Sequence, residues 1–207
     1  MAEIAVIILA AGKSSRFSQG GAKLVADFNS KPLVRWAVDA AVASRANPII
    51  VVTGYAWEQI EVAIGDARVV FVHNEDYATG LASSLRAGLA ALPREVAGAV
   101  ICLADMPKVT SSLIDRLIAR FARARGEAHA IVPVHEGRWG NPTLIARGLF
   151  ERIATLEGDE GAKRILREPT TKVIKLPVGD AGILVDIDAP EDLRKLLRPS
   201  RVDPGSD

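Results

Sequence analysis

Residues 4–23, IAVIILAAGKSSRFSQGGAK, place an apolar segment directly before a basic loop. The run Ile4–Ala10 is continuously apolar, which is typical of a strand covered on both faces of a parallel sheet. The loop that follows is rich in glycine and serine, and glycine accepts backbone conformations that are barred to other residues. Its basic side chains, Lys13, Arg16 and Lys23, could hold polyphosphate beside backbone N–H groups. The stretch therefore predicts a nucleotide site at the end of a buried strand.

Two better-known phosphate loops do not fit this stretch. Gly12-Lys-Ser14 is similar to the end of a P-loop, G-x-x-x-x-G-K-[ST], but the first glycine of that motif would fall on Ile7, inside the strand. The dinucleotide fingerprint G-x-G-x-x-G also fails, because no glycine follows Gly12 until Gly20. The sequence favours a different kind of nucleotide loop.

Length and composition set the class of protein. The chain has 207 residues, 49% of them hydrophobic and 25% charged, which is enough for one well-buried globular core. We expect a single domain over residues 1–198 and a disordered tail over 199–207, where few residues are apolar. The net charge of +1 gives no indication of a nucleic-acid or membrane surface.

The single cysteine and the N-terminal residues bear on the compartment. Cys102 is the only cysteine, which fits a reducing compartment, and its place in an apolar run predicts a buried, unreactive thiol. No signal-peptide pattern is present at the N-terminus, and no apolar run reaches the roughly 18–20 residues that span a bilayer. We expect a cytoplasmic enzyme.

Strand and helix patterns alternate along the chain, which predicts a Rossmann-like, mostly parallel sheet in a three-layer α/β/α arrangement. Glycines and a proline between residues 137 and 142 indicate a hairpin, so an antiparallel strand should interrupt the sheet. Ligands bind beyond the carboxyl ends of such strands. The strands are expected at 4–10, 49–53, 69–72, 100–103, 130–134, 143–145, 173–176 and 183–185. The helices are expected at 32–44, 57–64, 81–92, 113–125, 149–155, 161–166 and 191–197, with Ser112 and Asp115 as a capping box for the fourth.

Carboxylates follow two of these predicted strands. In the segment Leu103-Ala-Asp-Met-Pro107, Asp105 places a carboxylate at the end of a predicted strand. Nucleotidyl transfer needs a divalent ion, which carboxylates and phosphates usually hold. Asp186 and Asp188 offer a second carboxylate, and we favour Asp188 for the metal. The alternatives are structural: Asp105 as a turn residue before a proline, and Asp188 as the N-cap of the last helix with Glu191 completing a capping box.

Polar residues at three further places could contact a ligand. Ser83 and Ser84 open a predicted helix after Gly80 and could hydrogen-bond a base or ribose, although capping of that helix is the plainer alternative. Asn141 could line an acceptor pocket or belong to a turn. Asp159 could also line the acceptor pocket, or it could cap a short helix.

Taken together, the motifs resemble those of the MobA-like nucleotidyltransferases and, within them, the molybdenum cofactor cytidylyltransferases. The resemblance rests on segments that occur in family order over residues 4–192, namely Leu9-Ala-Ala-Gly12 with Arg16 and Lys23, Asn74 with Gly80–Gly88, Leu103–Pro107, Gly140-Asn-Pro142, Gly158–Ala162 and Asp186–Asp192. It implies a glycosyltransferase-A-type fold, dependence on Mg²⁺, and transfer of CMP from CTP to molybdopterin with release of pyrophosphate. In such proteins alanine before the loop glycine accompanies cytosine, so Ala11 favours CTP.

The resemblance also implies roles for individual residues. Leu9, Ala10, Ala11 and Gly12 would contact the base and ribose, with Lys13 beside them, and Gly80, Ser83 and Ser84 would help to select the base. Arg16 would bind the β- and γ-phosphates, Lys23 would stabilise charge on the α-phosphate, and Asp105 would hold Mg²⁺, with Asp188 as the second carboxylate that the residues themselves favour. Asn141 and Asp159 would contact the acceptor. No enzyme nucleophile is needed, because the acceptor's phosphate attacks the α-phosphorus in line.

Other functions remain open at the level of the sequence. One is cytidylyl transfer to another phosphorylated acceptor such as methylerythritol phosphate. Another is a non-catalytic molybdenum cofactor chaperone that serves a client molybdoenzyme, although the presence of both Lys23 and Asp105 argues against a purely binding role. A third is an oxidoreductase of the same fold, which the missing dinucleotide fingerprint disfavours. No nucleic-acid or membrane partner is expected.

Overall fold

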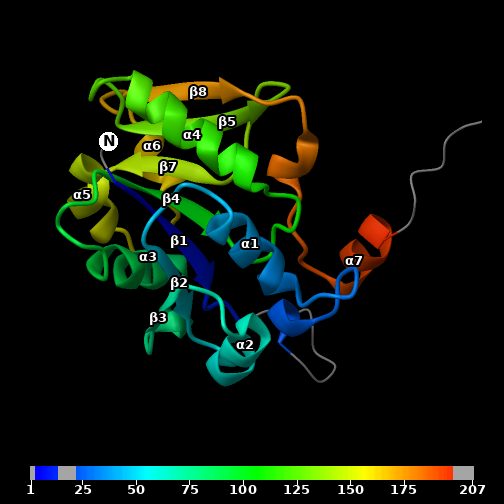
Figure 1. Cartoon of the computed structure of the whole chain (residues 1–207). Coiled ribbons are helices and arrows are strands. Elements are labelled where there is room, and N and C mark those ends of the chain that lie inside the picture. Colours follow the sequence, from blue (N-terminus) through cyan, green and yellow to red (C-terminus); the bar gives the residue numbers. More distant parts are fainter. Residues whose placement is uncertain (1–2, 14–21, 198–207) are drawn as a thin grey trace, which may run out of the picture.

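The structure, a computed structural model, describes residues 3–13 and 22–197 (Figure 1). Across these residues the strands form one eight-stranded sheet with the order β3-β2-β1-β4-β7-β5-β6, and β8 pairs with β5. The strands are β1 Ile4–Ala10, β2 Ile49–Thr53, β3 Val70–His73, β4 Gly98–Leu103, β5 Ala130–His135, β6 Arg138–Trp139, β7 Thr143–Ala146 and β8 Val173–Pro177. The helices are α1 Leu33–Val42, α2 Trp57–Ile64, α3 Leu81–Ala90, α4 Ser111–Arg123, α5 Phe150–Ala154, α6 Lys163–Leu166 and α7 Pro190–Leu197. Short 3-10 helices are η1 Lys23–Val25, η2 Tyr77–Thr79, η3 Arg147–Leu149 and η4 Ala181–Leu184.

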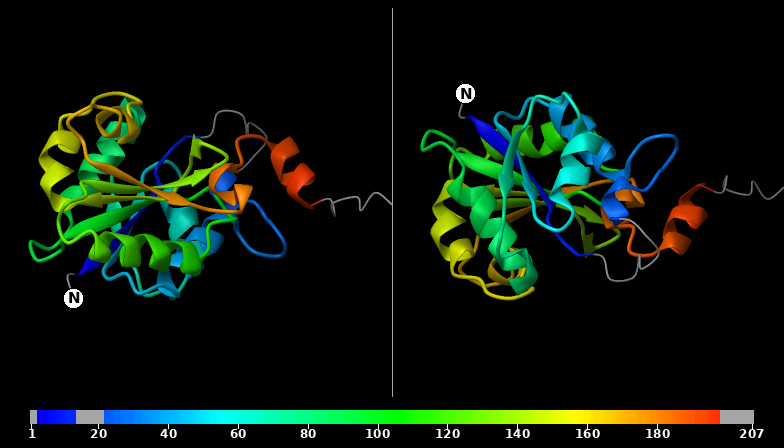
Figure 2. Two further views of the ribbon diagram at one scale, coloured as in Figure 1. Left: turned by 90° about the horizontal axis from the view of Figure 1, so that it is seen from above. Right: turned by 90° about the horizontal axis from the view of Figure 1, so that it is seen from below.

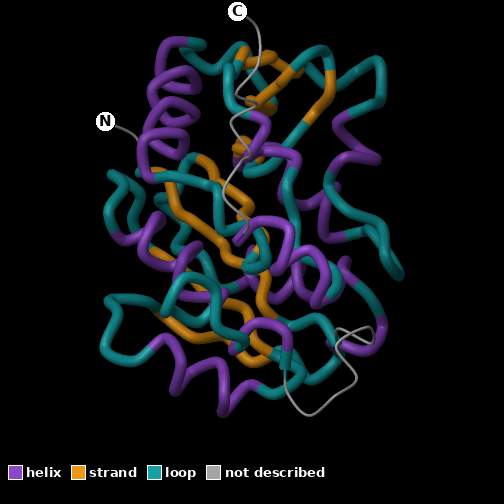
Figure 3. Tube along the Cα trace, turned by 90° about the vertical axis from the view of Figure 1, so that its right-hand side faces the viewer, coloured by secondary structure: helices purple, strands orange, loops and turns teal. Residues whose placement is uncertain are grey.

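Strand β1 is buried along its whole length because both faces of the sheet are covered. Successive side chains of a strand point to opposite faces. Ile4, Val6 and Ile8 therefore enter one core, together with buried residues of α1, α2 and α4. Ala5, Ile7 and Leu9 enter the other core, against α3, α5 and α6. The views in Figures 2 and 3 show the sheet as a twisted central layer with helices on either side.

The antiparallel interruption falls at β7. Strands β1, β2, β3 and β4 pair in parallel, whereas β7 is antiparallel to both β4 and β5. Because β4 and β5 both oppose β7, their carboxyl ends point the same way. The hairpin of β5 and β6 thus lies at the same edge of the sheet as the ends of β1 and β4. The predicted fold class is confirmed, including the mostly parallel sheet with one antiparallel insertion.

Two local predictions are wrong. Residues 183–185 were expected as a strand, but they lie in and after the 3-10 helix η4, where the Asp180 carboxylate accepts a hydrogen bond from the Gly182 N–H at 2.7 Å. Such an Asx-type bond offers the backbone an alternative to a sheet ladder. The predicted capping box of Ser112 and Asp115 is also wrong, because Thr110 caps α4 by accepting from the Leu113 N–H.

Asp115 has a different role in the structure. Its carboxylate accepts a hydrogen bond from the Arg45 N–H at 2.8 Å and lies 3.5 Å from the Arg45 guanidinium. This carboxylate therefore ties α4 to the loop after α1 instead of completing a cap. Sequence spacing alone could not separate the two arrangements, since Thr110 and Ser112 are both residue types that cap helices.

Cys102 lies inside β4 and is buried, as expected from its apolar neighbours. Burial raises the pKa of its thiol to about 12, so it stays protonated at neutral pH. The predicted tail at 199–207 and the predicted phosphate ligand Arg16 lie outside the described residues. Within the described residues, no helix is both long and apolar enough to cross a membrane.

Candidate nucleotide-binding site

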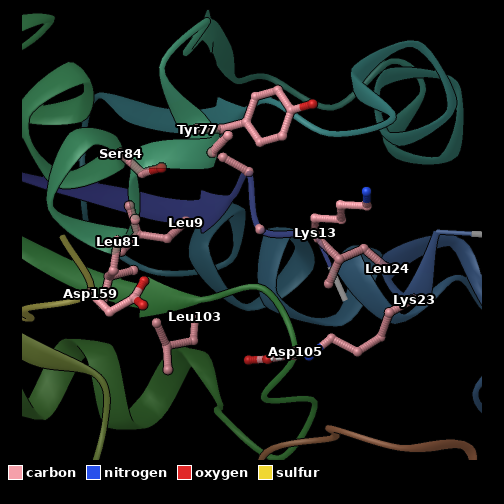
Figure 4. A pocket seen from close by; sticks show the side chains of 14 residues that line it. Leu9, Lys13, Lys23, Leu24, Tyr77, Leu81, Ser84, Leu103, Asp105 and Asp159 are labelled. Carbon is pink, nitrogen blue, oxygen red and sulfur yellow. Dashed lines mark hydrogen bonds and ion pairs between the residues drawn. The ribbon is translucent and has the colours of Figure 1, made fainter. Parts of the chain in front are cut away.

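A cavity of about 540 Å³ opens at the carboxyl ends of β1 and β4 (Figure 4). This is the edge at which parallel α/β sheets bind ligands. The residues that line the cavity come from the first loop, η1, the start of α3, the end of β4 and the loop before α6. They are Leu9, Ala11, Gly12, Lys13, Lys23, Leu24, Tyr77, Ala78, Gly80, Leu81, Ser84, Leu103, Asp105 and Asp159.

Lys23 forms the charged centre of this cavity. The 3-10 helix η1 holds it with only 8% of its surface exposed. Its ammonium donates a hydrogen bond to Asp105 Oδ2 at 2.7 Å and lies 3.5 Å from Asp188 Oδ1. Figure 4 shows the Lys23 and Asp105 side chains facing each other across one end of the cavity. A buried cation thus stands between two carboxylates, one from the middle of the chain and one from near its C-terminus.

The Asp105 carboxylate has a second oxygen, Oδ1, beside the one that accepts from Lys23. Oδ1 of Asp105 is buried and has no hydrogen-bond partner among the described residues. Buried polar atoms are normally satisfied, so an orphaned carboxylate oxygen points to a missing ligand. Asp105 and Asp188 converge on one point, and carboxylate oxygens are the ligands that Mg²⁺ and Mn²⁺ prefer.

The donor set fits a divalent cation shared with a nucleotide. In the part of the chain that the structure describes, no group of three or more acidic, histidine or cysteine side chains could enclose a metal by itself. Mg²⁺ is usually bound through one or two carboxylates together with substrate phosphates. Two carboxylates beside an open cavity match that requirement.

Asn74 organises the opposite end of the cavity. Its buried amide nitrogen donates to Ser83 Oγ at 2.9 Å and to Ser84 Oγ at 3.1 Å. Ser83 in turn donates to backbone carbonyls of Gly80 or Asp76, and it does not line the cavity. Ser84 does line the cavity, although it is only 4% exposed. Neither serine caps α3, whose N-cap is Gly80.

Gly80 brings the loop before α6 into the site. Its φ of 114° lies in the region that favours glycine, and a Cβ there would stand 2.2 Å from the Gly158 carbonyl carbon. The Gly158 carbonyl accepts from the Ala82 N–H at 3.0 Å. This close approach places Asp159 in the cavity wall beside Leu81 and Leu103, as Figure 4 shows.

We expect Gly80→Ala to destabilise the protein, since the new methyl group meets backbone at a strained φ. Strain of this kind costs of order 1–3 kcal/mol, and urea unfolding should show a fall of that size in the free energy of unfolding. The matched control is Gly148→Ala, because nothing lies within 4 Å of a Cβ at Gly148. Equal stability of the two variants would contradict this account of Gly80.

The remaining predicted residues are divided between this cavity and its surroundings. Lys13 lines the cavity, with its ammonium 5.8 Å from the centre of the Tyr55 ring. Ala10 is buried behind the cavity and does not line it. Asn141 and Asp186 instead line a second cavity of about 220 Å³, which shares Leu103 with the first.

The start of the last helix was expected to be capped by Asp188, with Glu191 completing a capping box. In the described residues the Asp192 carboxylate accepts the hydrogen bonds at this helix start instead. The backbone N–H groups of Asp188 and Ala189 donate to the Asp192 carboxylate at 3.2 and 3.0 Å. These hydrogen bonds lower the pKa of Asp192. Asp192 thus stabilises the start of α7, and Asp188 faces Lys23.

Sequence reasoning missed several residues of the cavity. Tyr77, Leu81, Leu103 and Leu24 line it without carrying an obvious chemical signal. Asn74 belongs to one of the family motifs, but no role in ligand binding is predicted for it from the sequence. Its position could have indicated one, since a polar residue just after a predicted strand often lies at the ligand-binding edge of the sheet.

The fold and this cavity define a class of protein, an α/β enzyme that handles a nucleotide at the carboxyl edge of its sheet. The MobA-like NTP transferase domain family matches residues 6–173. The chain belongs to this family and is an enzyme of the nucleotidyltransferase type.

Similar proteins cover nearly the whole chain. The molybdenum cofactor cytidylyltransferase of Escherichia coli K12 is 27% identical over 93% of this chain and 94% of its own length. Nicotine blue oxidoreductase of Paenarthrobacter nicotinovorans is 26% identical over 92% of this chain and 95% of its own. The crystal structure of Rv0371c from Mycobacterium tuberculosis H37Rv superimposes with a TM-score of 0.83 at 27% identity, over 95% of this chain and 99% of that one. A manganese complex of Rv0371c gives a TM-score of 0.80 at 25% identity, over 94% and 98%.

Proposed function

We propose that this protein is a Mg²⁺-dependent cytidylyltransferase that transfers CMP from CTP to molybdopterin and releases pyrophosphate. The observation that carries the proposal is the buried Lys23 ammonium between Asp105 and Asp188, beside a cavity large enough for a nucleotide. The similarity to a molybdenum cofactor cytidylyltransferase supports the choice of base and acceptor. We also propose that residues 1–198 form one domain and that the enzyme works in the cytoplasm.

In the proposed reaction, an oxygen of the acceptor's phosphate forms a bond to the α-phosphorus of CTP. The bond from that phosphorus to the oxygen bridging to the β-phosphorus breaks, and pyrophosphate leaves with the electron pair. Lys23 would stabilise the negative charge that grows on the α-phosphate oxygens, because its ammonium is buried and already oriented. The protein contributes position and charge, without a nucleophile of its own.

Asp105 and Asp188 would hold the divalent ion. When bound, that ion neutralises charge on the phosphate oxygens and orients the leaving group. The unused Oδ1 of Asp105 gives it a ligand without breaking an existing hydrogen bond. Mg²⁺ is our choice, and the manganese complex of the similar Rv0371c is consistent with a divalent ion in this fold.

The base would lie at the other end of the cavity. Leu9, Leu81 and Ala11 offer apolar contact there, while Ser84 offers a hydroxyl that Asn74 holds in place. Gly12 lies between the two ends and leaves open space, since nothing lies within 4 Å of a Cβ at this position. A ribose could therefore come close to the backbone. Lys13 and Arg16 would complete the binding of the triphosphate.

The test compares four nucleoside triphosphates and then measures transfer. With Mg²⁺ present, CTP should raise the melting temperature more than ATP, GTP or UTP, because a ligand that binds only the folded state stabilises it. Mass spectrometry should then detect CMP-molybdopterin and pyrophosphate from CTP and purified molybdopterin. Preference for another triphosphate, with no CMP-molybdopterin formed, would overturn the proposal.

One further acceptor, one redox cofactor and one insertion assay belong in the same experiment. Methylerythritol phosphate tests whether another phosphorylated acceptor receives CMP. NAD(P)H is included because a nicotine blue oxidoreductase is among the similar proteins. A spectral change with NAD(P)H and no dependence on CTP would favour an oxidoreductase. Insertion of cofactor into a client molybdoenzyme that survives Lys23→Ala would favour a chaperone.

A further inference from the structure

The turn that follows β2, residues 54–56, packs against the wall of the nucleotide cavity from behind. In the described part of the chain these three residues do not line the cavity themselves. The Tyr55 N–H donates to the Ala11 carbonyl at 3.1 Å. A Cβ on Gly54 would stand 2.6 Å from the Cβ of Tyr77 and 3.0 Å from the Cβ of Ala11. The β2 turn therefore fits tightly against two residues that do line the cavity.

The backbone of the β2 turn is held in an unfavourable conformation. Ala56 has a φ of 55°, in the left-handed region that residues with a Cβ rarely adopt. Strained residues of this kind persist only where the surrounding structure fixes them, and they are frequent near functional sites. A strained turn behind a cavity wall indicates a use for the side chain that the turn presents, which is Tyr55.

The Lys13 ammonium lies over the ring of Tyr55. The distance from Lys13 Nζ to the ring centre is 5.8 Å. A cation within about 6 Å of an aromatic ring centre is attracted by the negative face of the ring. Lys31 and Arg147 also lie over rings, but neither of them lines the nucleotide cavity. The contact of Lys13 with Tyr55 thus joins a cation of the cavity wall to the β2 turn.

Tyr77 supports the Tyr55 ring from the side of the cavity. The two ring centres lie 6.4 Å apart with their planes at 56°, which is within the range of interacting aromatic pairs. Tyr77 lines the cavity, and in the view of Figure 4 the Lys13 side chain lies between Tyr77 and Lys23. The aromatic pair and the hydrogen bond to Ala11 together fix the place of the Tyr55 ring.

We propose that Tyr55 is a positioning residue whose ring holds the Lys13 ammonium beside the cavity, where Lys13 binds the phosphate chain of a nucleoside triphosphate. The inference rests on the proposed function, because it concerns the triphosphate that the same site would bind. Lys13 is exposed, and an exposed lysine samples many rotamers that binding has to restrict. The ring restricts them beforehand, which lowers the entropic cost of binding.

Binding of inorganic tripolyphosphate with Mg²⁺, measured by isothermal titration calorimetry, tests the phosphate contact without a base. Tyr55→Leu should raise the Kd about two- to fivefold, the range that an exposed cation–π contact gives. Tyr55→Phe should keep the wild-type Kd, because a phenyl ring still faces the ammonium. Trp57→Leu is the matched control, since Trp57 is 41% exposed against 37% for Tyr55 but its ring contacts His73. Equal Kd values for Tyr55→Leu and Trp57→Leu would overturn the proposal.

A double-mutant cycle separates positioning of Lys13 from a purely structural role of Tyr55. Lys13→Met should raise the Kd for tripolyphosphate about tenfold, the effect of losing a hydrogen bond between charged groups. Adding Tyr55→Leu to Lys13→Met should change the Kd no further, since no ammonium is left for the ring to hold. If Tyr55→Leu raises the Kd by the same factor with and without Lys13, the ring acts only through the fold and the proposal is wrong.

Ring signals in NMR spectra provide a measurement that does not depend on Tyr55→Leu. The chain has two tyrosines, so their ring signals can be assigned with Tyr55→Phe. Tripolyphosphate with Mg²⁺ should shift the Tyr55 ring signals of the wild-type protein, because the anion binds the ammonium that lies over this ring. The same addition should leave them unmoved in Lys13→Met. Unmoved signals in the wild-type protein, or equal shifts in both proteins, would contradict the positioning role.

The positioning role and the transferase proposal fail in different ways. If another triphosphate is preferred to CTP while Tyr55 and Lys13 stay coupled in tripolyphosphate binding, the cytidylyltransferase proposal fails and the role of Tyr55 stands. If CMP is transferred to molybdopterin and the cycle shows no coupling, the transfer stands and the role of Tyr55 is wrong. In the transfer assay we expect Tyr55→Leu to raise the KM for CTP and to leave kcat within about twofold, as for a loss of uniform binding.

Discussion

Lys23→Met should lower the turnover of CMP transfer by about 10²–10³-fold, the typical loss when one stabilising donor is removed from a transition state. The methionine keeps the unbranched shape and most of the length of the side chain, and removes the charge that lies 2.7 Å from Asp105 and 3.5 Å from Asp188. The loss should appear in kcat, because the charge on the α-phosphate oxygens grows as the reaction proceeds. Steady-state measurement of pyrophosphate release provides both kcat and KM.

Lys31→Met is the matched control for this variant. Lys31 also pairs with an aspartate at 2.7 Å, but it lies just before α1 with 35% of its side chain exposed and does not line the cavity. Its removal should leave turnover within about twofold, since exposed ion pairs contribute little. Turnover of Lys23→Met within about threefold of wild type would show that Lys23 is structural, because donors that stabilise a transition state contribute far more.

Asp105→Asn should remove most of the metal-dependent activity, with a loss of turnover of at least about 10²-fold. The amide keeps the shape of the side chain but takes away the charge of a ligand whose Oδ1 is buried and, within residues 3–13 and 22–197, has no hydrogen-bond partner. Binding of Mn²⁺ in the presence of CTP, followed by electron paramagnetic resonance, should weaken in parallel. The spectroscopic measurement separates loss of metal from loss of catalysis.

Two further variants test whether the loss of Mn²⁺ binding is specific to the carboxylates beside Lys23. Asp188→Asn should also weaken Mn²⁺ binding, by less than Asp105→Asn, because Asp188 is more exposed and lies farther from the ammonium. Asp115→Asn is the control, as its carboxylate pairs with Arg45 far from the cavity. Unchanged Mn²⁺ binding in both Asp105→Asn and Asp188→Asn would rule out the metal site proposed for this pair.

Much of the fold could be predicted from the sequence because its strongest signals are periodic. The continuous apolar run Ile4–Ala10 has to be covered on both faces, which requires helices above and below. The glycines and proline of the 137–142 segment correctly indicated the antiparallel strand. Residues 183–185 could not be assigned in this way, because a short apolar run fits a strand or one turn of a helix, and the Asp180 side chain decides between them.

The candidate site was less predictable because it depends on which side chains meet. Asp186 and Asp188 share a sequence segment, yet one lines the second cavity and the other faces Lys23. The residue between them, Ile187, donates its backbone N–H to the Asp105 carbonyl at 3.1 Å, and no pattern in the sequence encodes this contact.

The antiparallel strand β7 has a consequence for where the β5–β6 hairpin lies. Strand β8 occupies one edge of β5, so β6 and β7 follow one another along the other edge. Because β7 also pairs with β4, Trp139 on β6 lies in line with the strand next to β4, about one strand spacing of 4.8 Å away. The inserted strand thus brings the hairpin up to the loop that carries Asp105 instead of holding it at a distance.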